Sequence, residues 1–262
     1  MRIIVTGGSG KAGRWVVRDL RDHGHDVLNV DLTHDGSDFG LCTLADLTDA
    51  GQAHDVVAGA DVVVHLAAIP APELRPVGDT FRINTLSTWN VFHAAVAAGV
   101  GRVVWASSET VLGLPFDRPP DFAPIDETIT PRPETSYALS KLVGETLAEQ
   151  LNRQTGTPFV GFRISNIMEP HDYARFPGFW DDPQLRRWNL WGYVDARDVA
   201  MIGDSFGGSL KLLLAERERN LRAVVVFSAA GYSWDRSPEL RTRLLNAVTQ
   251  IGAPVFFISR RE

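Results

Sequence analysis

The chain has 262 residues, of which 44% are hydrophobic and 22% charged, and this composition is ordinary for one large globular domain. A formal net charge of −6 supplies no excess of cations for binding a nucleic acid or an anionic membrane, and no apolar run approaches the length of a membrane span. Cys42 is the single cysteine, so it cannot form an internal disulfide, and it lies in no zinc-binding spacing. We therefore predict a soluble, cytoplasmic protein without a metal, whose partner is a small molecule.

Short apolar runs alternate with helical patterns through the first two-thirds of the chain. The apolar runs, which we interpret as buried strands, are residues 3–6, 27–30, 61–67, 102–106 and 158–164. The helical patterns cover about residues 11–23, 85–98 and 136–150, and Gly24 and Gly99 end the first two. This alternation favours an α/β fold, a doubly wound parallel sheet with helices on both faces.

Two longer segments interrupt the alternation. Residues 114–133 contain six prolines, and residues 169–193 are rich in Trp, Phe and Pro. Long loops of a compact fold commonly carry the site that binds a ligand, so we expect these segments to form the substrate loops. A proline-rich connector without such a role is the alternative.

A glycine-rich segment, TGGSGKAG at residues 6–13, follows the first predicted strand and opens the first predicted helix. Gly7 permits a tight turn, Gly10 lets the backbone approach a pyrophosphate, and Gly13 lets the helix pack closely against the sheet. The N-terminus of that helix favours the negative charge of the pyrophosphate. Other strand-to-helix turns also need glycine, so this segment alone is weak evidence for a dinucleotide site.

Asp31 strengthens the dinucleotide interpretation. It ends the second predicted strand, 24 positions after Gly7, where a carboxylate can accept hydrogen bonds from the ribose hydroxyls of adenosine. Its negative charge would repel a 2′-phosphate, and no Arg follows closely to bind one. The sequence therefore favours NAD over NADP as the cofactor.

Tyr137 and Lys141 lie four positions apart on a predicted helix, so both side chains emerge on one face. A phenol with an unperturbed pKa of about 10 is a poor base at neutral pH, but a neighbouring ammonium and the positive nicotinamide ring both favour the phenolate. Tyr137 could then exchange the proton of a substrate hydroxyl while Lys141 holds the nicotinamide ribose. By itself, this pattern also occurs on solvated helix faces.

Several motifs in order over residues 1–199 resemble those of the extended short-chain dehydrogenases/reductases, the NAD-dependent epimerase/dehydratase family. These motifs are residues 6–13, Asp46-Leu47-Thr48, His65-Leu66-Ala67-Ala68, Asn84 and Tyr137-x-x-x-Lys141. The resemblance implies that Asp46 and Leu47 lie beside the adenine and that Leu66 and Ala67 line the ribose side. A helix cap is the alternative for Asp46, and a packed strand residue is the alternative for His65. The expected cofactor-binding residues are Gly7, Ser9, Gly10, Lys11, Ala12, Gly13, Asp31, Leu32, Asp46, Leu47, Leu66, Ala67, Ala68, Tyr137 and Lys141.

The resemblance also supplies a catalytic serine. Trp105-Ala106-Ser107-Ser108 ends a predicted strand about 30 residues before Tyr137. Counting back from Gly113 aligns Ser108 with the family's serine that polarises the substrate oxygen, and Ser107 is the alternative. We therefore expect Ser108, Tyr137 and Lys141 to form the catalytic group.

The substrate is less well defined by the sequence. The segment from Arg163 to Pro170 is similar to small, non-nucleotide-sugar members of the family such as uronate dehydrogenases. We expect substrate contacts from Asn84, Arg163 and Asn166, although an Arg at the end of a strand is more commonly an ion-pairing residue. Sugar-nucleotide epimerases and dehydratases share the same front half, and Glu109 beside Ser108 keeps a dehydratase open.

The last third of the chain has a different character. Residues from about 199 to 262 resemble an incomplete α/β-hydrolase of the dienelactone-hydrolase type, with Ser205 at the position of the nucleophile elbow. A serine nucleophile needs a histidine base, and no His follows His171, so we interpret Ser205 as a turn residue. We predict a chimera with an NAD-binding Rossmann domain and substrate loops at 1–199. The hydrolase-like strands and helix of 200–262 would complete the same sheet.

The sequence as a whole thus predicts an NAD-dependent oxidoreductase that acts on a sugar-like secondary alcohol. The alternatives are a nucleotide-sugar epimerase or dehydratase and a catalytically inert NAD-binding chimera, whereas an esterase is disfavoured by the missing histidine. Related proteins pair two helices into a four-helix bundle, and the resemblance therefore implies a homodimer through residues 84–98 and 136–150.

Overall fold

Segments rich in Val and Ile form a six-stranded, fully parallel sheet in the computed structural model. Its strands are β1 (Arg2–Thr6), β2 (Asp26–Asp31), β3 (Cys42–Leu44), β4 (Val62–His65), β5 (Arg102–Ser108) and β6 (Phe159–Ile164). Their order in the sheet is β3-β2-β1-β4-β5-β6, which is the Rossmann order and confirms the predicted doubly wound fold. From β1 the strand order runs outward to β3 on one side, and from β4 it runs outward to β6 on the other. Sheets of this kind bind their ligands at the switch point between β1 and β4.

The structure describes residues 1–33, 42–114, 116, 118–122, 129–175, 193–197, 199, 203–204, 224–227, 242 and 255–258. These residues fall into two compact units, Met1–Tyr193 and Val194–Glu262. Within the described part, no helix is long and apolar enough to cross a membrane, and no three His, Cys, Asp or Glu side chains form a group that could hold a metal ion.

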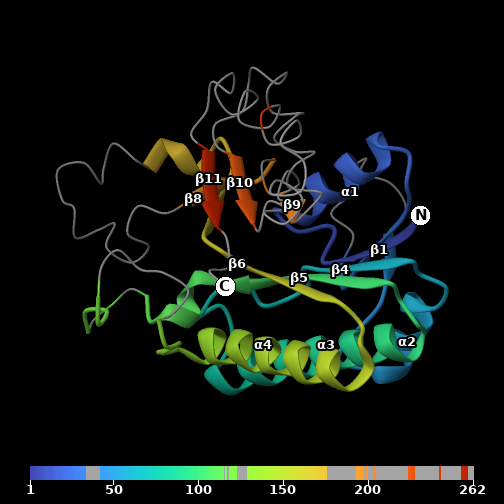
Figure 1. Cartoon of the computed structure of the whole chain (residues 1–262), viewed down its shortest axis with the longest axis horizontal. Coiled ribbons are helices and arrows are strands. Elements are labelled where there is room, and N and C mark those ends of the chain that lie inside the picture. The colour runs from blue at the N-terminus through green and yellow to red at the C-terminus, as the bar shows by residue number, and fades with distance from the viewer. Residues whose placement is uncertain are drawn as a thin grey trace. The chain divides into compact units, whose positions relative to one another are not determined.

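Helices cover both faces of the six-stranded sheet (Figure 1). They are α1 (Gly13–Asp22), α2 (Ala50–Val57), α3 (Val77–Ala97) and α4 (Ser136–Thr155), with short 3-10 turns η1 (Glu109–Leu112) and η2 (Asp172–Arg175). α2, α3 and α4 lie on one face and α1 lies on the other. Local signals fix the ends of α4, because the Thr135 hydroxyl caps the backbone N–H of Ala138 at 3.0 Å and Gly156 follows with φ +75°.

Trp105 anchors the core between the sheet and α4. Its indole is 2% exposed and packs edge-on against Phe92 of α3. Glycines make room for it on both sides, since a Cβ at Gly144 of α4 would lie 3.0 Å from the indole and one at Gly161 of β6 would lie 2.8 Å from it. This close packing fixes α4, and with it Tyr137 and Lys141, against the end of β5.

The helices and strands differ from the sequence prediction mainly at their boundaries. α3 begins at Val77, eight residues before the predicted start, because Pro76 precedes it and Asp79 lies in its first turn. α1 begins at Gly13 rather than near Lys11, since Gly10 and Lys11 belong to the turn. β3 and α2 were not predicted from the sequence.

The second unit contains parallel strands that pair with one another. β9 (Gly203–Asp204), β10 (Val224–Phe227) and β11 (Val255–Ile258) form a sheet of order β11-β10-β9. β8 (Tyr193–Asp195) spans the division between the units. That the hydrolase-like strands complete the six-stranded sheet stays a prediction. Ser205 lies outside the described residues.

Candidate cofactor and catalytic site

A cavity of ≈ 750 Å³ lies at the carboxyl ends of the parallel strands, a volume that suits a small-molecule cofactor. Residues that end or directly follow β1, β2, β4, β5 and β6 line it. Most of the predicted site residues share this cavity, namely Gly7, Gly10, Lys11, Ala12, Gly13, Asp31, Leu32, Asp46, Leu47, Leu66, Ala67, Ala68, Ser108, Tyr137, Lys141 and Asn166. The tertiary structure therefore brings the predicted cofactor and catalytic residues to one place.

The glycine loop adopts the tight turn predicted for it. Gly7 has φ +71°, donates its backbone N–H to the carbonyl of Val30 at 2.8 Å, and accepts from the N–H of Gly10 at 3.1 Å. Gly13 packs so closely that a Cβ there would lie 2.0 Å from the Gly7 carbonyl oxygen. No side chain caps the N-terminus of α1, which is the arrangement that leaves a helix N-terminus for an anion.

Asp31 stands at the end of β2 and holds the edge of the loop. Its carboxylate accepts from the backbone N–H of Ser9 at 3.0 Å and from that of Leu32 at 2.7 Å. Ser9 does not line the cavity, and its hydroxyl contacts Asn29 and Cys42 instead. Ser9 therefore stabilises the loop, whereas Asp31 also faces the cavity. Together, the helix N-terminus, the Asp31 carboxylate and the cavity volume fit a dinucleotide.

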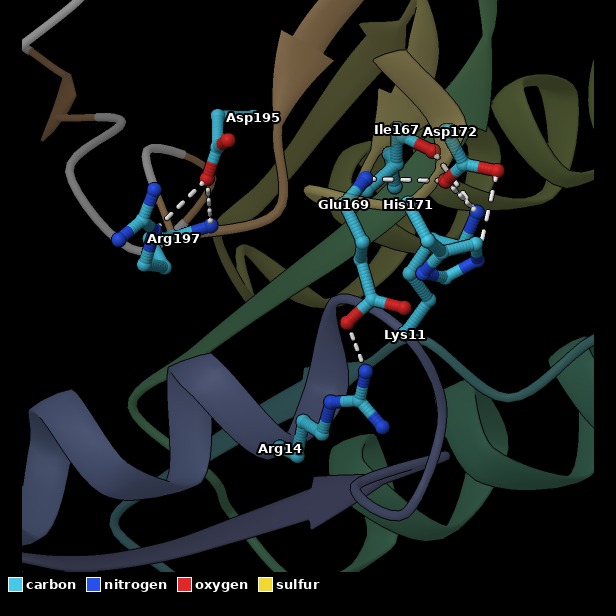
Figure 2. A network of polar contacts seen from close by, with 8 residues as sticks. All are labelled: Lys11, Arg14, Ile167, Glu169, His171, Asp172, Asp195 and Arg197. Carbon is cyan, nitrogen blue, oxygen red and sulfur yellow. Dashed lines mark hydrogen bonds and ion pairs between the residues drawn. The ribbon is translucent and has the colours of Figure 1, made fainter. Parts of the chain in front are cut away.

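Lys11 makes contacts that could not be predicted from the sequence. Its ammonium lies 2.6 Å from the Asp172 carboxylate and 3.3 Å from the carbonyl of Ile167. Arg14, one turn along, forms an ion pair with Glu169 (Figure 2). Lys11 of the glycine loop and Arg14 of the first turn of α1 thus hold the segment that follows β7 (Asn166–Met168), so Lys11 links the cofactor loop to that segment.

The residues expected on the adenosine side line this same cavity. Asp46 and Leu47 line the cavity beside Leu66 and Ala67. The Asp46 carboxylate accepts from the backbone N–H and the hydroxyl of Thr48 at 2.9 and 2.7 Å, and these bonds lower its pKa. The cap of α2 is Asp49 rather than Asp46, so the helix-cap alternative for Asp46 is wrong.

Ser108 and Tyr137 meet at the end of β5. A hydrogen bond joins the two side chains and lowers the pKa of the Tyr137 phenol, but burial raises that pKa more, and the charge of Glu109 raises it further. The Ser108 hydroxyl also accepts from the hydroxyl of Thr110 at 2.9 Å. Ser107, the alternative serine, donates to Glu145 at 2.6 Å, so Ser108 is the serine that faces the phenol.

Lys141 is buried beside Tyr137, with its ammonium 5.8 Å from the centre of the phenol ring and 2.8 Å from the carbonyl oxygen of Ala106. Burial lowers the pKa of Lys141 to about 8. From the sequence we expected this ammonium to lower the pKa of Tyr137, yet the net shift of that pKa is upward because the phenol is desolvated. Proton transfer at Tyr137 therefore needs more help than Lys141 alone supplies.

His65 occupies the packed position that was its alternative interpretation. It is 3% exposed, and its two ring nitrogens lie 2.7 Å from the Thr6 hydroxyl and 3.2 Å from the Thr88 hydroxyl. Burial lowers the pKa of His65 to about 3, with a contribution from the charge of Lys141. His65 is thus a neutral residue that fixes β4 beside β1 and α3.

Comparison with known proteins agrees with this geometry. The model of the NAD dependent epimerase/dehydratase family matches residues 3–187. The chain belongs to this family. It is therefore an NAD-dependent enzyme of the extended short-chain dehydrogenase/reductase type, and the predicted family, fold class and cofactor are confirmed. The hydrolase resemblance of residues 199–262 stays a prediction.

Several sugar dehydrogenases are similar to this family member. The NAD-dependent glucose-6-phosphate dehydrogenase of Haloferax volcanii is 30% identical over 68% of this chain and 74% of its own length. The L-arabinose 1-dehydrogenase (NAD(P)(+)) of the same organism is 33% identical over 64% of this chain and 67% of its own. The solved structure of a mutated uronate dehydrogenase is 28% identical, with a TM-score of 0.62 over 76% of this chain and 66% of that one.

Two of the three predicted substrate residues do not line the cavity. Asn84 is 2% exposed and bonds to both backbone groups of Ile69 and to the Ser140 hydroxyl. The guanidinium of Arg163 forms two hydrogen bonds to the Glu145 carboxylate, at 2.9 and 2.7 Å. Long-range partners therefore use the polar atoms of both side chains, and their contact with a substrate stays a prediction. Asn166 does line the cavity.

Glu109 is the residue that, from the sequence, keeps a dehydratase open. It begins η1 directly after Ser108 and lines the cavity. Burial raises the pKa of Glu109 to about 7, and the Ser165 side chain lowers it in part. Its position next to Ser108 was the available signal, but its burial depends on segments distant in the sequence.

Proposed function

We propose that this family member transfers a hydride between NAD and a sugar-like secondary alcohol, with Tyr137 as the group that takes or returns the hydroxyl proton. The observation that carries the proposal is the meeting of Ser108, Tyr137 and Lys141 in the same cavity as the glycine loop. An alcohol oxygen placed beside both Ser108 and Tyr137 could accept one hydrogen bond and give up one proton.

Each residue of this group has a separate task. The Ser108 hydroxyl would polarise the substrate oxygen, while Lys141, held by the Ala106 carbonyl, would bind the nicotinamide ribose. Bound NAD⁺ supplies the hydride acceptor and a positive ring. Burial raises the pKa of Tyr137 and so favours the neutral phenol. A positive charge near the phenol would oppose this effect and favour the ionised form, which can accept a proton.

Steady-state turnover with NAD tests the function directly. A panel of neutral aldoses, uronic acids, sugar phosphates and nucleotide sugars should show NADH formation with at least one non-nucleotide sugar. Interconversion of a nucleotide sugar without NADH accumulation would instead identify an epimerase. NAD binding without turnover on any member of the panel would support the inert protein and reject the proposal.

Asp31 should set the cofactor preference. We expect the unmodified protein to bind NAD at least about tenfold more tightly than NADP, since the Asp31 carboxylate lines the cavity and would repel the extra phosphate. Asp31→Ala should weaken NAD binding and reduce the preference. Calorimetric titration with both cofactors measures this, with Asp55→Ala, on α2 outside the cavity, as the matched control. Equal affinities in the unmodified protein would contradict the assignment.

We further propose a homodimer through α3 and α4. These two helices pack against each other, and Leu86, Trp89 and Leu139 leave 37%, 39% and 44% of their surfaces exposed. Pairing two copies of this face would bury these apolar side chains. Sedimentation velocity at micromolar concentration should give a dimer, and Trp89→Glu should shift it to monomer, whereas a monomeric unmodified protein would rule the interface out.

We also propose a cytoplasmic location, which the single cysteine supports.

A further inference from the structure

The turn that follows β7 is attached to the start of α1 and to the loop before it (Figure 2). The Lys11 ammonium donates to the Asp172 carboxylate at 2.6 Å and to the carbonyl oxygen of Ile167 at 3.3 Å. The Arg14 guanidinium forms an ion pair with the Glu169 carboxylate. Two ion pairs therefore hold the turn, and one further hydrogen bond holds β7 itself.

Asp172 also closes this turn from within. One oxygen of its carboxylate, Oδ2, accepts from both the Lys11 ammonium and the backbone N–H of Glu169, the latter at 2.9 Å. The backbone N–H of Asp172 donates in return to the carbonyl of Glu169 at 2.9 Å. Asp172 and Glu169 are 6% and 8% exposed, so a nearby cation is needed to offset the cost of burying each carboxylate. The shape of the turn thus depends on the charge of Lys11.

Both of the attached parts line the cofactor cavity. The glycine loop contributes Lys11, and β7 contributes Asn166 and Ile167. Lys11 joins the two parts directly, because it bonds to Ile167 as well as lining the cavity. Asp172 does not belong to the described lining, so it would act on the cofactor through Lys11. A shift of the glycine loop would therefore be passed on to Asn166, which we expect to contact the substrate.

The Lys11 ammonium could act on a dinucleotide in two ways, and Asp172 has opposite effects in them. If the ammonium binds the pyrophosphate directly, the Asp172 carboxylate competes for it and lowers the affinity for NAD. If the ammonium instead holds the turn in place, Asp172 supports the bound state and raises that affinity. The contacts favour the second role, because the ammonium has two acceptors in residues 167–172 and one of them is a buried carboxylate.

We propose that Lys11 and Asp172 are positioning residues, which fasten residues 166–172 to the glycine loop so that NAD binding fixes both parts together. NAD that orders the loop also orders Asn166 and Ile167. The attached segment in turn holds the loop in the shape that binds NAD, since such coupling is reciprocal. This inference rests on NAD as the cofactor and not on the proposed sugar oxidation, so NAD binding tests it whether or not a sugar is turned over.

Asp172→Asn tests the attachment, because it removes the charge and keeps the shape of the side chain. We expect it to weaken NAD binding about three- to tenfold in calorimetric titration. Hydrogen–deuterium exchange gives an independent readout. NAD should slow the exchange of the backbone amides of residues 167–172 in the unmodified protein, and Asp172→Asn should lose most of this slowing. Asp22→Asn is the matched control, since it removes a carboxylate from the exposed pair with Arg18 on α1, and it should change neither measurement.

A double-variant cycle tests whether the two residues act as one pair. Lys11→Gln leaves the Asp172 carboxylate without this cation near an anionic cofactor, so it should weaken NAD binding more than Asp172→Asn does. The double variant should bind NAD about as tightly as Asp172→Asn alone, because the pair is already broken there. Lys11→Arg keeps the charge and should restore most of the affinity that Lys11→Gln loses.

Tighter NAD binding by Asp172→Asn would overturn the inference and identify Lys11 as a direct ligand of the pyrophosphate. Unchanged affinity in Asp172→Asn would overturn it too, as would single effects that simply add in the double variant. Urea unfolding checks that each variant is folded. If Asp172→Asn is not, Lys11→Gln decides the question, since the Lys11 side chain is 39% exposed: NAD that still slows the exchange of residues 167–172 in that variant would contradict the inference.

Discussion

Tyr137→Phe should lower kcat for sugar oxidation by about two to four orders of magnitude, because it removes the group that accepts the hydroxyl proton. The ring remains in its buried position on α4, so folding and NAD affinity should stay close to those of the unmodified protein. Ser108→Ala should cost a similar factor, since it removes a hydrogen bond to the oxygen on which charge develops. Turnover is followed as NADH absorbance with the best sugar of the panel.

Controls for this prediction use hydroxyls elsewhere in the chain. Tyr193→Phe changes a tyrosine that is 47% exposed and does not line the cavity, and it should leave turnover unchanged. Ser205→Ala should also change it little, because no histidine that could serve as its base follows in the sequence. Nearly normal kcat in Tyr137→Phe would disprove the assigned role. If the protein hydrolyses a generic ester and Ser205→Ala loses this activity, the result would support an esterase function instead.

Gly13→Ala should disrupt the cofactor loop. The added Cβ would lie 2.0 Å from the Gly7 carbonyl oxygen and 2.6 Å from the Gly8 Cα. Both are backbone atoms, so no side-chain rotation relieves the clash, and either α1 or the loop must move. Overpacking of this kind costs about 1–3 kcal/mol of folding free energy, and displacement of the loop should weaken NAD binding by at least about tenfold.

Gly78→Ala provides the matched control for that substitution. Gly78 lies in the first turn of α3, and a Cβ there would meet nothing within 4 Å. Its stability should be unchanged or slightly higher, because Ala is the better helix former. Urea unfolding and NAD titration of both variants complete the comparison. Unaltered stability and NAD affinity in Gly13→Ala would show that the loop has more freedom than its close packing indicates.

Local patterns were sufficient to predict the cofactor side of the site. Each pattern is set by the period of one helix or strand, or by one turn. These patterns are the glycine loop, Asp31 at a strand end and the four-residue spacing from Tyr137 to Lys141. The order of strands and helices then constrains the sheet to few arrangements, because parallel strands need crossover helices of fixed hand. These residues therefore line the cavity that the sequence implied.

Residues whose roles depend on distant partners were decided by the tertiary structure. Asn84 is bonded to Ser140, 56 positions away, and Arg163 to Glu145, 18 positions away. No local pattern distinguishes such a pair from two polar residues that face a substrate. The same holds for Ser9, whose hydroxyl is bonded to Asn29.

The sequence by itself determined the family, the fold class and the cofactor, since each depends on short motifs in a fixed order. It could name Ser108 and Ser107 only as alternatives, and β5, η1 and α4 had to come together before one serine faced Tyr137 and the other Glu145. It placed Glu109 beside Ser108 but could not give its burial. Desolvation is a property of everything packed around a side chain, so only the tertiary structure could raise the pKa of Glu109 to about 7.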